Sequence, residues 1–180
     1  MTNHSLIIKQ TQNWLSNVVI ALSICPFAKR EFDRGSIHYE VIASDNHQQQ
    51  LEQLILSCEQ LDENPEIETS LLIFTNAFTD FYDYLDFVDI ANKLMRKQDY
   101  EGVYQLATFH PAYCFEGSDG NDASNYTNRS PYPMLHILRE ASLERVLANY
   151  PDPESIPERN IKLTRELGLK AMQKLLADCF

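Results

Sequence analysis

Short apolar segments that alternate with longer amphipathic stretches constrain the fold of this chain most. Strands are expected over residues 37–43, 71–74 and 103–109, where β-branched, aromatic and other apolar residues cluster. Between them, residues 46–62 and 80–97 place apolar side chains at helical spacing. Both connections are long enough for a crossover, so the pattern predicts a small three-stranded parallel sheet with right-handed crossover helices.

Further helices are expected on both sides of this unit. An N-terminal helix over 5–24 should end before Pro26, because the residue before a proline is pushed out of the α region. Two C-terminal helices are expected over 132–149 and 157–178, with several prolines between them. A chain of 180 residues with this pattern is predicted to be one α/β domain.

The net charge of −11 comes mainly from the middle of the chain, since residues 46–101 hold twelve acidic and three basic side chains. A protein that binds phosphate backbones needs a basic face. No apolar run approaches the roughly 20 residues that span a bilayer. The sequence therefore predicts neither a nucleic-acid nor a membrane partner.

The first residues, Met1–His4, lack the basic and apolar parts of a secretory signal. The four cysteines form no Cys-x-x-Cys pair, so free thiols are expected. Together these features predict a cytoplasmic protein. They leave the cofactor and the oligomeric state unknown.

The polar connection between residues 110 and 131 is unusually long for a compact domain, which is typical of a functional loop. It leaves the carboxyl end of a predicted strand, where ligands of open parallel sheets bind, and enters a predicted helix whose free N–H groups would attract anions. Candidate ligand-binding residues are Asn125, Thr127, Asn128, Arg129 and Ser130. The alternative is that these side chains only cap the helix and order their own loop.

Three residues of the expected helix 132–149 are further candidates. Arg139 falls within the apolar stripe of that helix, so its guanidinium needs a carboxylate partner or a bound anion. His136 and Glu140 are four residues apart, a spacing that allows a histidine–carboxylate pair acting as a general base, with His110 as another base. A surface pair without a role is the alternative.

Cys25 precedes Lys29 and Arg30, and these cations would lower the pKa of its thiol and favour a nucleophile. The spacing does not match the loop of a cysteine phosphatase. A cysteine buried at a helix end is the alternative interpretation.

The sequence resembles an uncharacterised bacterial family, domain of unknown function 1415. The segments that carry the resemblance are Cys25–Arg30, Gln105–Tyr113 and Asn125–His136, followed by Arg139 and Glu140. The resemblance implies a short bacterial cytosolic protein and supplies no reaction.

Three functions fit these features. The first is an enzyme or binder of a small phosphorylated or carboxylated metabolite, which predicts that Arg129 and His136 line one pocket. The second is a metal-binding protein with His110, His136 and Glu140 as ligands, joined by Cys25 or Cys114. The third is a non-catalytic interaction protein that uses the long loop as a docking surface.

Overall fold

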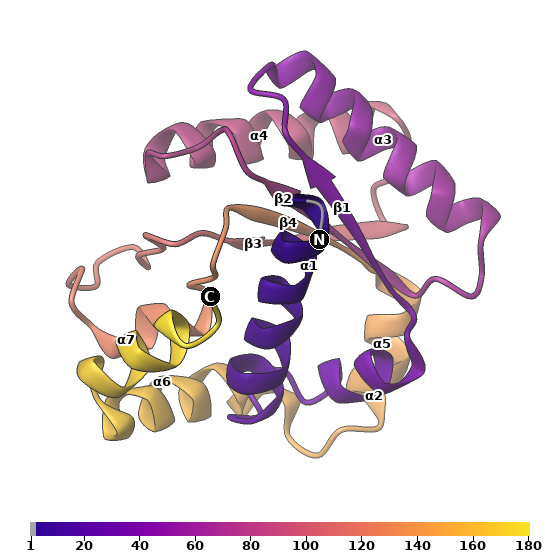
Figure 1. Cartoon of the computed structure of the whole chain (residues 1–180). Helices are drawn as coiled ribbons and strands as arrows, with labels where there is room; N and C mark the ends of the chain where they lie inside the picture. The colour runs from indigo at the N-terminus through magenta and orange to yellow at the C-terminus, as the bar shows by residue number, and fades with distance from the viewer. Residues whose placement is uncertain (1–2) are drawn as a thin grey trace.

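A computed structural model describes residues 3–180. Met1 and Thr2, which belong to the segment considered for a secretory signal, lie outside the described residues. The chain forms one mixed sheet with helices on both faces (Figure 1). Within residues 3–180, no helix combines the length and the apolar character that crossing a membrane requires.

The helices are α1 (Asn3–Trp14), α2 (Ala28–Arg34), α3 (His47–Glu63), α4 (Phe81–Lys97), α5 (Glu140–Ala148), α6 (Ile156–Leu167) and α7 (Leu169–Ala177). The shorter helical segments are the π-helical turn η1 (Leu15–Ile20) and the 3₁₀ turns η2 (Ala123–Thr127) and η3 (Pro153–Ser155). The strands are β1 (Ile37–Ile42), β2 (Thr69–Phe74), β3 (Tyr104–Phe109) and β4 (Met134–Arg139).

The sheet has four strands in the order β1-β2-β4-β3, so the expected three-stranded parallel sheet is wrong in strand number and pairing. β1 and β2 pair in parallel, whereas β4 is antiparallel to both β2 and β3. The first three strands therefore share one direction, as the crossover pattern requires. β4 lies between β2 and β3 and pairs with both of them.

The helix expected over 132–149 is wrong in its first half, where the chain forms β4 before α5 begins at Glu140. Pro131 and Pro133 are compatible with the first turn of a helix, but each also restrains the residue before it to extended backbone. The segment that follows is then buried on both sides of the sheet, with Met134 in one core and Leu135 in the other. A strand covered on both faces has no polar alternation that would distinguish it from a buried helix.

Two other helices differ from expectation in their continuity. The predicted helix 5–24 is α-helical only to Trp14 and then widens into the π-helical turn η1. The predicted helix 157–178 is divided at Gly168, whose φ of 84° and ψ of 158° are incompatible with a continuous helix. The division lets α6 pack against η2 while α7 contacts both η1 and η2.

The sheet separates two apolar cores. Helices α3 and α4 cover one face, where Leu54 and Phe87 pack against Leu72 and Phe74 of β2 (Figure 1). On the other face, Trp14 and the residues of η1 pack against Leu71 and Ile73 of the same strand. Figure 1 shows α1, α2 and α5 on this second side, and between them and the sheet the packing leaves a cavity.

Candidate functional site

A cavity lies between the sheet and the layer formed by α1, η1, α2 and α5. It has a volume of about 220 Å³. Its floor consists of side chains from all four strands: Ile37, Thr69, Leu71, Ala107, Phe109, His136 and Leu138. Its opposite wall comes from the surrounding helices and includes Trp14, Leu15, Val19, Cys25, Phe27, Leu143 and Val146. The lining is mainly apolar, and its polar residues include Glu31, Glu68, Arg139 and Ser142.

His136 is the central polar group of the floor. It lies on β4 opposite Leu71 of β2 on one side and Ala107 of β3 on the other. The alternation of side chains along β4 places His136 and Leu138 on the cavity face, with Ile137 in the opposite core. The fold therefore holds one imidazole inside an apolar cavity.

Thr69 determines which nitrogen of His136 carries the proton. Its Oγ1 lies 2.6 Å from Nε2 of His136 and 2.5 Å from the carbonyl oxygen of Ile137. A carbonyl oxygen only accepts, so the single hydroxyl proton is donated to Ile137, and Nε2–H of His136 donates to Thr69. Nδ1 is then unprotonated, and no hydrogen bond to it occurs among residues 3–180.

Burial lowers the pKa of His136 to about 4, because the apolar surroundings disfavour the charged imidazolium. The side chain keeps some accessible surface, and this surface faces the cavity that it lines. The imidazole is therefore neutral at physiological pH and offers the lone pair of Nδ1 to a molecule in the cavity.

Cys25 lines the same cavity as His136, so the fold brings together two candidates that are 111 positions apart in the sequence. Burial raises the pKa of the Cys25 thiol, and the N–H groups of Phe27 and Ala28 only partly oppose this rise. The predicted lowering of this pKa by Lys29 and Arg30 is wrong in direction.

Lys29 and Arg30 lie on the outer surface of α2. Lys29 pairs with Asp33 at 2.6 Å, and Nε of Arg30 lies 3.5 Å from Glu31. The side chains of Lys29 and Arg30 are 68% and 64% exposed, and neither residue lines the cavity. The structure therefore separates these two cations from the cysteine they were expected to activate.

Arg139 ends β4, is one of the residues that line the cavity, and is anchored by the protein itself. Its Nη2 donates to the carbonyl oxygens of Leu61 at 2.5 Å and Ile67 at 3.1 Å. Its Nη1 donates to the Tyr104 hydroxyl at 3.3 Å, and that hydroxyl donates to Asp62 at 2.6 Å. These contacts join β3 and β4 to the end of α3.

Glu140 begins α5, and its backbone N–H donates to the carbonyl oxygen of Val103 at 3.0 Å. In the described part of the chain, no hydrogen bond or ion pair joins Glu140 to His136. The expected helical pairing of these two residues is wrong because His136 lies on a strand.

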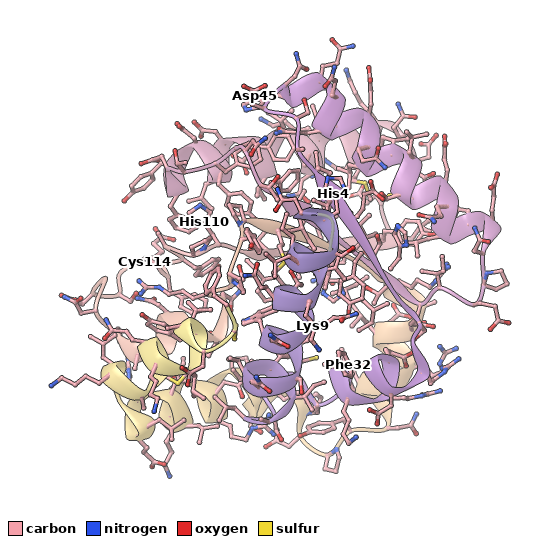
Figure 2. The ribbon with its side chains drawn as sticks, viewed as in Figure 1. His4, Lys9, Phe32, Asp45, His110 and Cys114 are labelled. Carbon is pink, nitrogen blue, oxygen red and sulfur yellow. The ribbon has the colours of Figure 1, made fainter. Side chains whose placement is uncertain are left out.

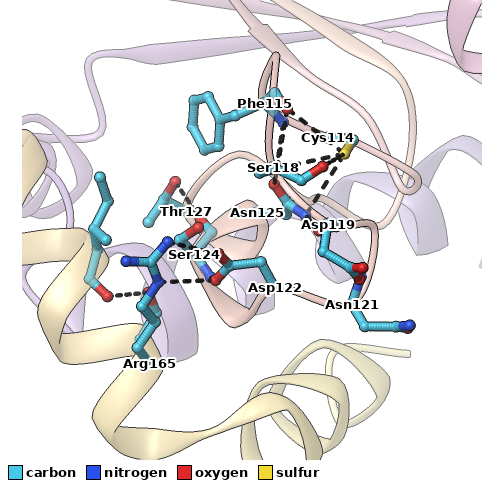
Figure 3. Close-up of polar contacts among 12 residues, drawn as sticks. Cys114, Phe115, Ser118, Asp119, Asn121, Asp122, Ser124, Asn125, Thr127 and Arg165 are labelled. Carbon is cyan, nitrogen blue, oxygen red and sulfur yellow. Dashed lines mark hydrogen bonds and ion pairs between the residues drawn. The ribbon is translucent and has the colours of Figure 1, made fainter.

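The loop between β3 and β4 uses most of its polar side chains internally, as Figure 3 shows. Asn125 is fully buried; its Oδ1 accepts from the Phe115 N–H at 3.0 Å and from the Ser118 hydroxyl at 2.9 Å. Its Nδ2 donates to the carbonyl oxygen of Asp119 at 2.9 Å. One amide side chain thus fixes three separate points of the loop.

The neighbouring candidates make similar contacts. Each donates to a backbone carbonyl oxygen. The Thr127 hydroxyl donates to that of Ser124 at 2.9 Å, and Nδ2 of Asn128 donates to that of Thr108 at 3.1 Å. The Ser130 hydroxyl donates to that of Tyr132 at 2.6 Å. An ion pair of 2.6 Å between Asp122 and Arg165 fastens the loop to α6 (Figure 3). This ion pair holds the pKa of the Asp122 carboxyl below its usual range.

Arg129 is also part of this loop framework. Its Nε donates to the carbonyl oxygen of Tyr113 at 3.0 Å, its Nη2 donates to that of Gly120 at 2.8 Å, and its guanidinium lies over the ring of Tyr126. The Trp14 indole donates to the backbone carbonyl of Arg129 at 3.0 Å. Arg129 does not line the cavity that contains His136, so the two residues do not share that pocket.

His110 is buried beneath α4, at the start of the loop (Figure 2). Its Nδ1 accepts from the Ala112 N–H at 3.0 Å, which leaves the proton on Nε2 to be donated to the carbonyl oxygen of Phe78 at 2.8 Å. Burial lowers the pKa of His110. Both nitrogens are occupied by the backbone, so His110 stabilises the loop.

Metal ligands do not gather in the described part of the chain. Among residues 3–180, no group of three or more His, Cys, Asp or Glu side chains is placed to hold a metal ion. His110, His136 and Glu140 in particular lie at three different places.

The model of a family described as "Protein of unknown function (DUF1415)" matches residues 6–174. The chain belongs to this family. No curated protein and no solved structure matches it. The match spans nearly the whole sequence, so β4 and its histidine lie within the part that defines this DUF1415 protein.

Thr69 and the aromatic lining of the cavity were not among the candidates predicted from the sequence. Thr69 is 67 residues from His136, and the contact between them depends on the register between β2 and β4. The rings of Trp14 and Phe109, which both line the cavity, pack against each other at a centroid distance of 5.1 Å. The two prolines before β4 were the only local signal that could have placed His136 on a strand.

Proposed function

We propose that this DUF1415 protein binds a small, mostly apolar molecule in the cavity between the sheet and the helices. The observation that carries the proposal is the neutral His136 imidazole, whose Nε2 is occupied by Thr69 and whose Nδ1 has no partner among residues 3–180. A ligand with one hydroxyl or N–H group would donate to Nδ1 while its apolar part fills the cavity.

The size and lining of the cavity agree with this ligand class. An apolar cavity of about 150 Å³ is large enough for benzene, and this one has a volume of about 220 Å³. Its walls include Trp14, Leu15 and Phe109, and sites of this kind combine an apolar lining with a few placed polar groups. An ionised phosphate fits such walls poorly, because burying an unpaired charge is costly.

The electrostatics of the site favour binding over nucleophilic catalysis. Transfer of the Cys25 proton to His136 is unfavourable, because burial raises the pKa of the thiol and lowers that of the imidazole to about 4. Both groups are therefore neutral at physiological pH. We assign His136 the role of a hydrogen-bond acceptor and Cys25 that of a wall residue.

A thermal-shift comparison of phenol and toluene tests the proposal, since the two molecules differ mainly in one hydroxyl group. A ligand at about 100 times its dissociation constant adds about 2.7 kcal/mol to the stability of the native state, which raises the melting temperature by several degrees. We expect a larger shift with phenol than with toluene in the wild type. We expect this difference to disappear in His136→Leu.

The His136→Leu replacement suits this test because Thr69 keeps its hydrogen bond to Ile137. The control is His38→Leu, since His38 lies on edge strand β1 and does not line the cavity. Perturbation of the His136 ring signals by phenol in NMR spectra of the wild type provides a check that needs no variant. Equal shifts with phenol and toluene would exclude the hydrogen bond, and no shift with either would exclude the cavity as a ligand site.

An anionic metabolite bound at Arg129 is the second candidate function. One observation favours it: no ion pair involves Arg129 in the described residues, although its guanidinium is partly accessible. Inorganic phosphate is the probe, with Arg129→Gln as the test variant and Arg145→Gln, on the exposed side of α5, as the control. Stabilisation by phosphate that only Arg129→Gln abolishes would establish this site. No response to phosphate or to phenol would favour the interaction hypothesis.

A further inference from the structure

A second cavity adjoins the one that contains His136. It has a volume of about 380 Å³ and lies between the segment after η1, the β3–β4 loop and α6. Its lining includes Ile24, Phe115, Ile156 and Ile161. Three residues line both cavities: Val19, Cys25 and Phe109. These three residues form the wall between an inner cavity, with His136, and an outer cavity.

The outer cavity suits an apolar occupant, although three amide or hydroxyl side chains line it. Nδ2 of Asn160 donates to the carbonyl oxygen of Ile24 at 2.8 Å. Nδ2 of Asn128 and the hydroxyl of Thr127 likewise donate to backbone carbonyls. These three side chains are therefore oriented toward the backbone, and most of the other lining residues are apolar, so the outer cavity offers a ligand mainly hydrophobic surface.

The backbone of the wall departs from regular structure. Val19 belongs to the π-helical turn η1, and its carbonyl oxygen accepts from the Ile24 N–H at 2.9 Å. Ser23 then adopts a left-handed conformation, with φ at 53°, two residues before Cys25. π-Helical turns and non-glycine residues with positive φ are enriched at functional sites. Here they place Val19 and Cys25 between the two cavities.

We infer that Val19, Cys25 and Phe109 set the maximum length of the ligand that the His136 cavity accepts. The inference rests on the proposed function, because the polar end of the ligand is taken to lie at His136. The ligand class is then an unbranched hydrocarbon chain with a terminal hydroxyl group. A chain that fits stops at the wall, whereas a smaller side chain in the wall would let its tail continue into the outer cavity.

Straight-chain primary alcohols from butanol to dodecanol are the probes, and calorimetric titration or thermal shift gives their affinities. Each added methylene that becomes buried should increase affinity about fourfold. In the wild type, we expect this increase to stop at the alcohol whose tail reaches the wall. In Val19→Ala, we expect the increase to continue through several longer alcohols.

The matched control is Val146→Ala, which removes the same atoms from a residue that lines the inner cavity alone. It should leave the limiting chain length within one methylene of the wild type. Cys25→Ala opens the same wall as Val19→Ala and replaces that variant if it does not fold. A crystal structure of the opened variant with a long alcohol should show the tail between Phe109 and α6.

The outcomes separate the two proposals. Binding of short alcohols with the same limit in the wild type, Val19→Ala and Cys25→Ala would overturn the role of the wall and leave the proposed function intact. An equal extension in Val146→Ala would also overturn it, because added volume alone would then explain the result. A wild type that binds no alcohol would overturn the proposed function, and the inference with it.

Discussion

The Thr69 hydroxyl accepts a hydrogen bond from Nε2–H of His136 across two antiparallel strands, at a distance of 2.6 Å. The same hydroxyl donates to the carbonyl oxygen of Ile137. Thr69 thereby provides a hydrogen-bond partner for Nε2 of a buried imidazole and leaves Nδ1 available to a molecule in the cavity. The stability of the fold and the chemistry of the candidate site depend on the same contact.

We predict that His136 makes the protein less stable as pH falls from about 6.5 to about 4. The pKa of His136 is lowered from 6.5 to about 4 in the folded state, so the unfolded chain takes up the proton first. The free energy of unfolding should lose about 3 kcal/mol across this range relative to His136→Leu. Urea denaturation of both proteins at a series of pH values measures this difference. Parallel pH profiles would contradict the assigned burial.

Two replacements of Thr69 test the contribution of its hydroxyl group separately from that of its side-chain size. Thr69→Val removes the acceptor for His136 and the donor for Ile137, and leaving such buried groups unsatisfied costs about 1–3 kcal/mol. Thr69→Ser keeps the hydroxyl and should be clearly more stable than Thr69→Val. Nitrogen-15 NMR of the ring should show the Nε2–H tautomer in the wild type and Thr69→Ser, and a mixture in Thr69→Val. Equal stability of the two variants would argue against the hydrogen bonds.

Asn125→Ala should destabilise the protein by about 2–4 kcal/mol, because it removes three hydrogen bonds from a fully buried position. Asn121→Ala is the control, since Asn121 is exposed and contributes its backbone N–H to the loop. Denaturant titration compares the two, and hydrogen exchange should show faster exchange of the Phe115 amide in Asn125→Ala alone. A small effect of Asn125→Ala would mean that the loop is ordered by other contacts.

Gly168→Ala should cost about 1–3 kcal/mol, because the backbone at Gly168 has φ 84° and ψ 158°, a conformation that side chains disfavour. No atom would obstruct the added methyl group, so the cost is conformational. Gly120→Ala provides the comparison, since Gly120 also has open space around it and lacks a positive φ. Thermal unfolding of the two variants should therefore differ, and equal melting temperatures would be evidence against the break between α6 and α7.

The local patterns predicted most of the elements that precede the long loop, although they predicted neither α2 nor the π-helical turn η1. Alternation at Ile37, Tyr39 and Val41 predicted β1, and the apolar run at 71–74 predicted β2. Helical spacing predicted α3 and α4 almost to their ends. These elements follow from neighbouring residues alone, because each has one face or one run that must be buried.

β4 could not be predicted in the same way. The sequence from Met134 to Arg139 is apolar on both faces, and His136 and Arg139 fit a helix as well as a strand. The insertion of β4 between β2 and β3 depends on pairings with residues at least 25 positions away. Because a helix was predicted here, Glu140 was expected to be the partner of His136. In the structure, His136 contacts Thr69 and lines the cavity.

The polar loop illustrates a second limit of sequence-based prediction. Asn125, Thr127 and Ser130 are the side chains that an anion site would use and also the ones that order a loop. The sequence contains the donors but not their directions. The structure shows that these three side chains form hydrogen bonds within the loop. Cys25 and His136, in contrast, line one cavity although no sequence motif relates their positions.

The position of β4 also determines when the sheet can be assembled during synthesis on the ribosome. β3 pairs with no strand other than β4 within residues 3–180. A nascent chain that has not yet emerged beyond residue 133 can join β1 to β2, but β3 still lacks its native partner β4. Non-local pairing of this kind slows folding. The sheet is therefore completed only after β4 has been synthesised, and β4 is also the strand that contains His136.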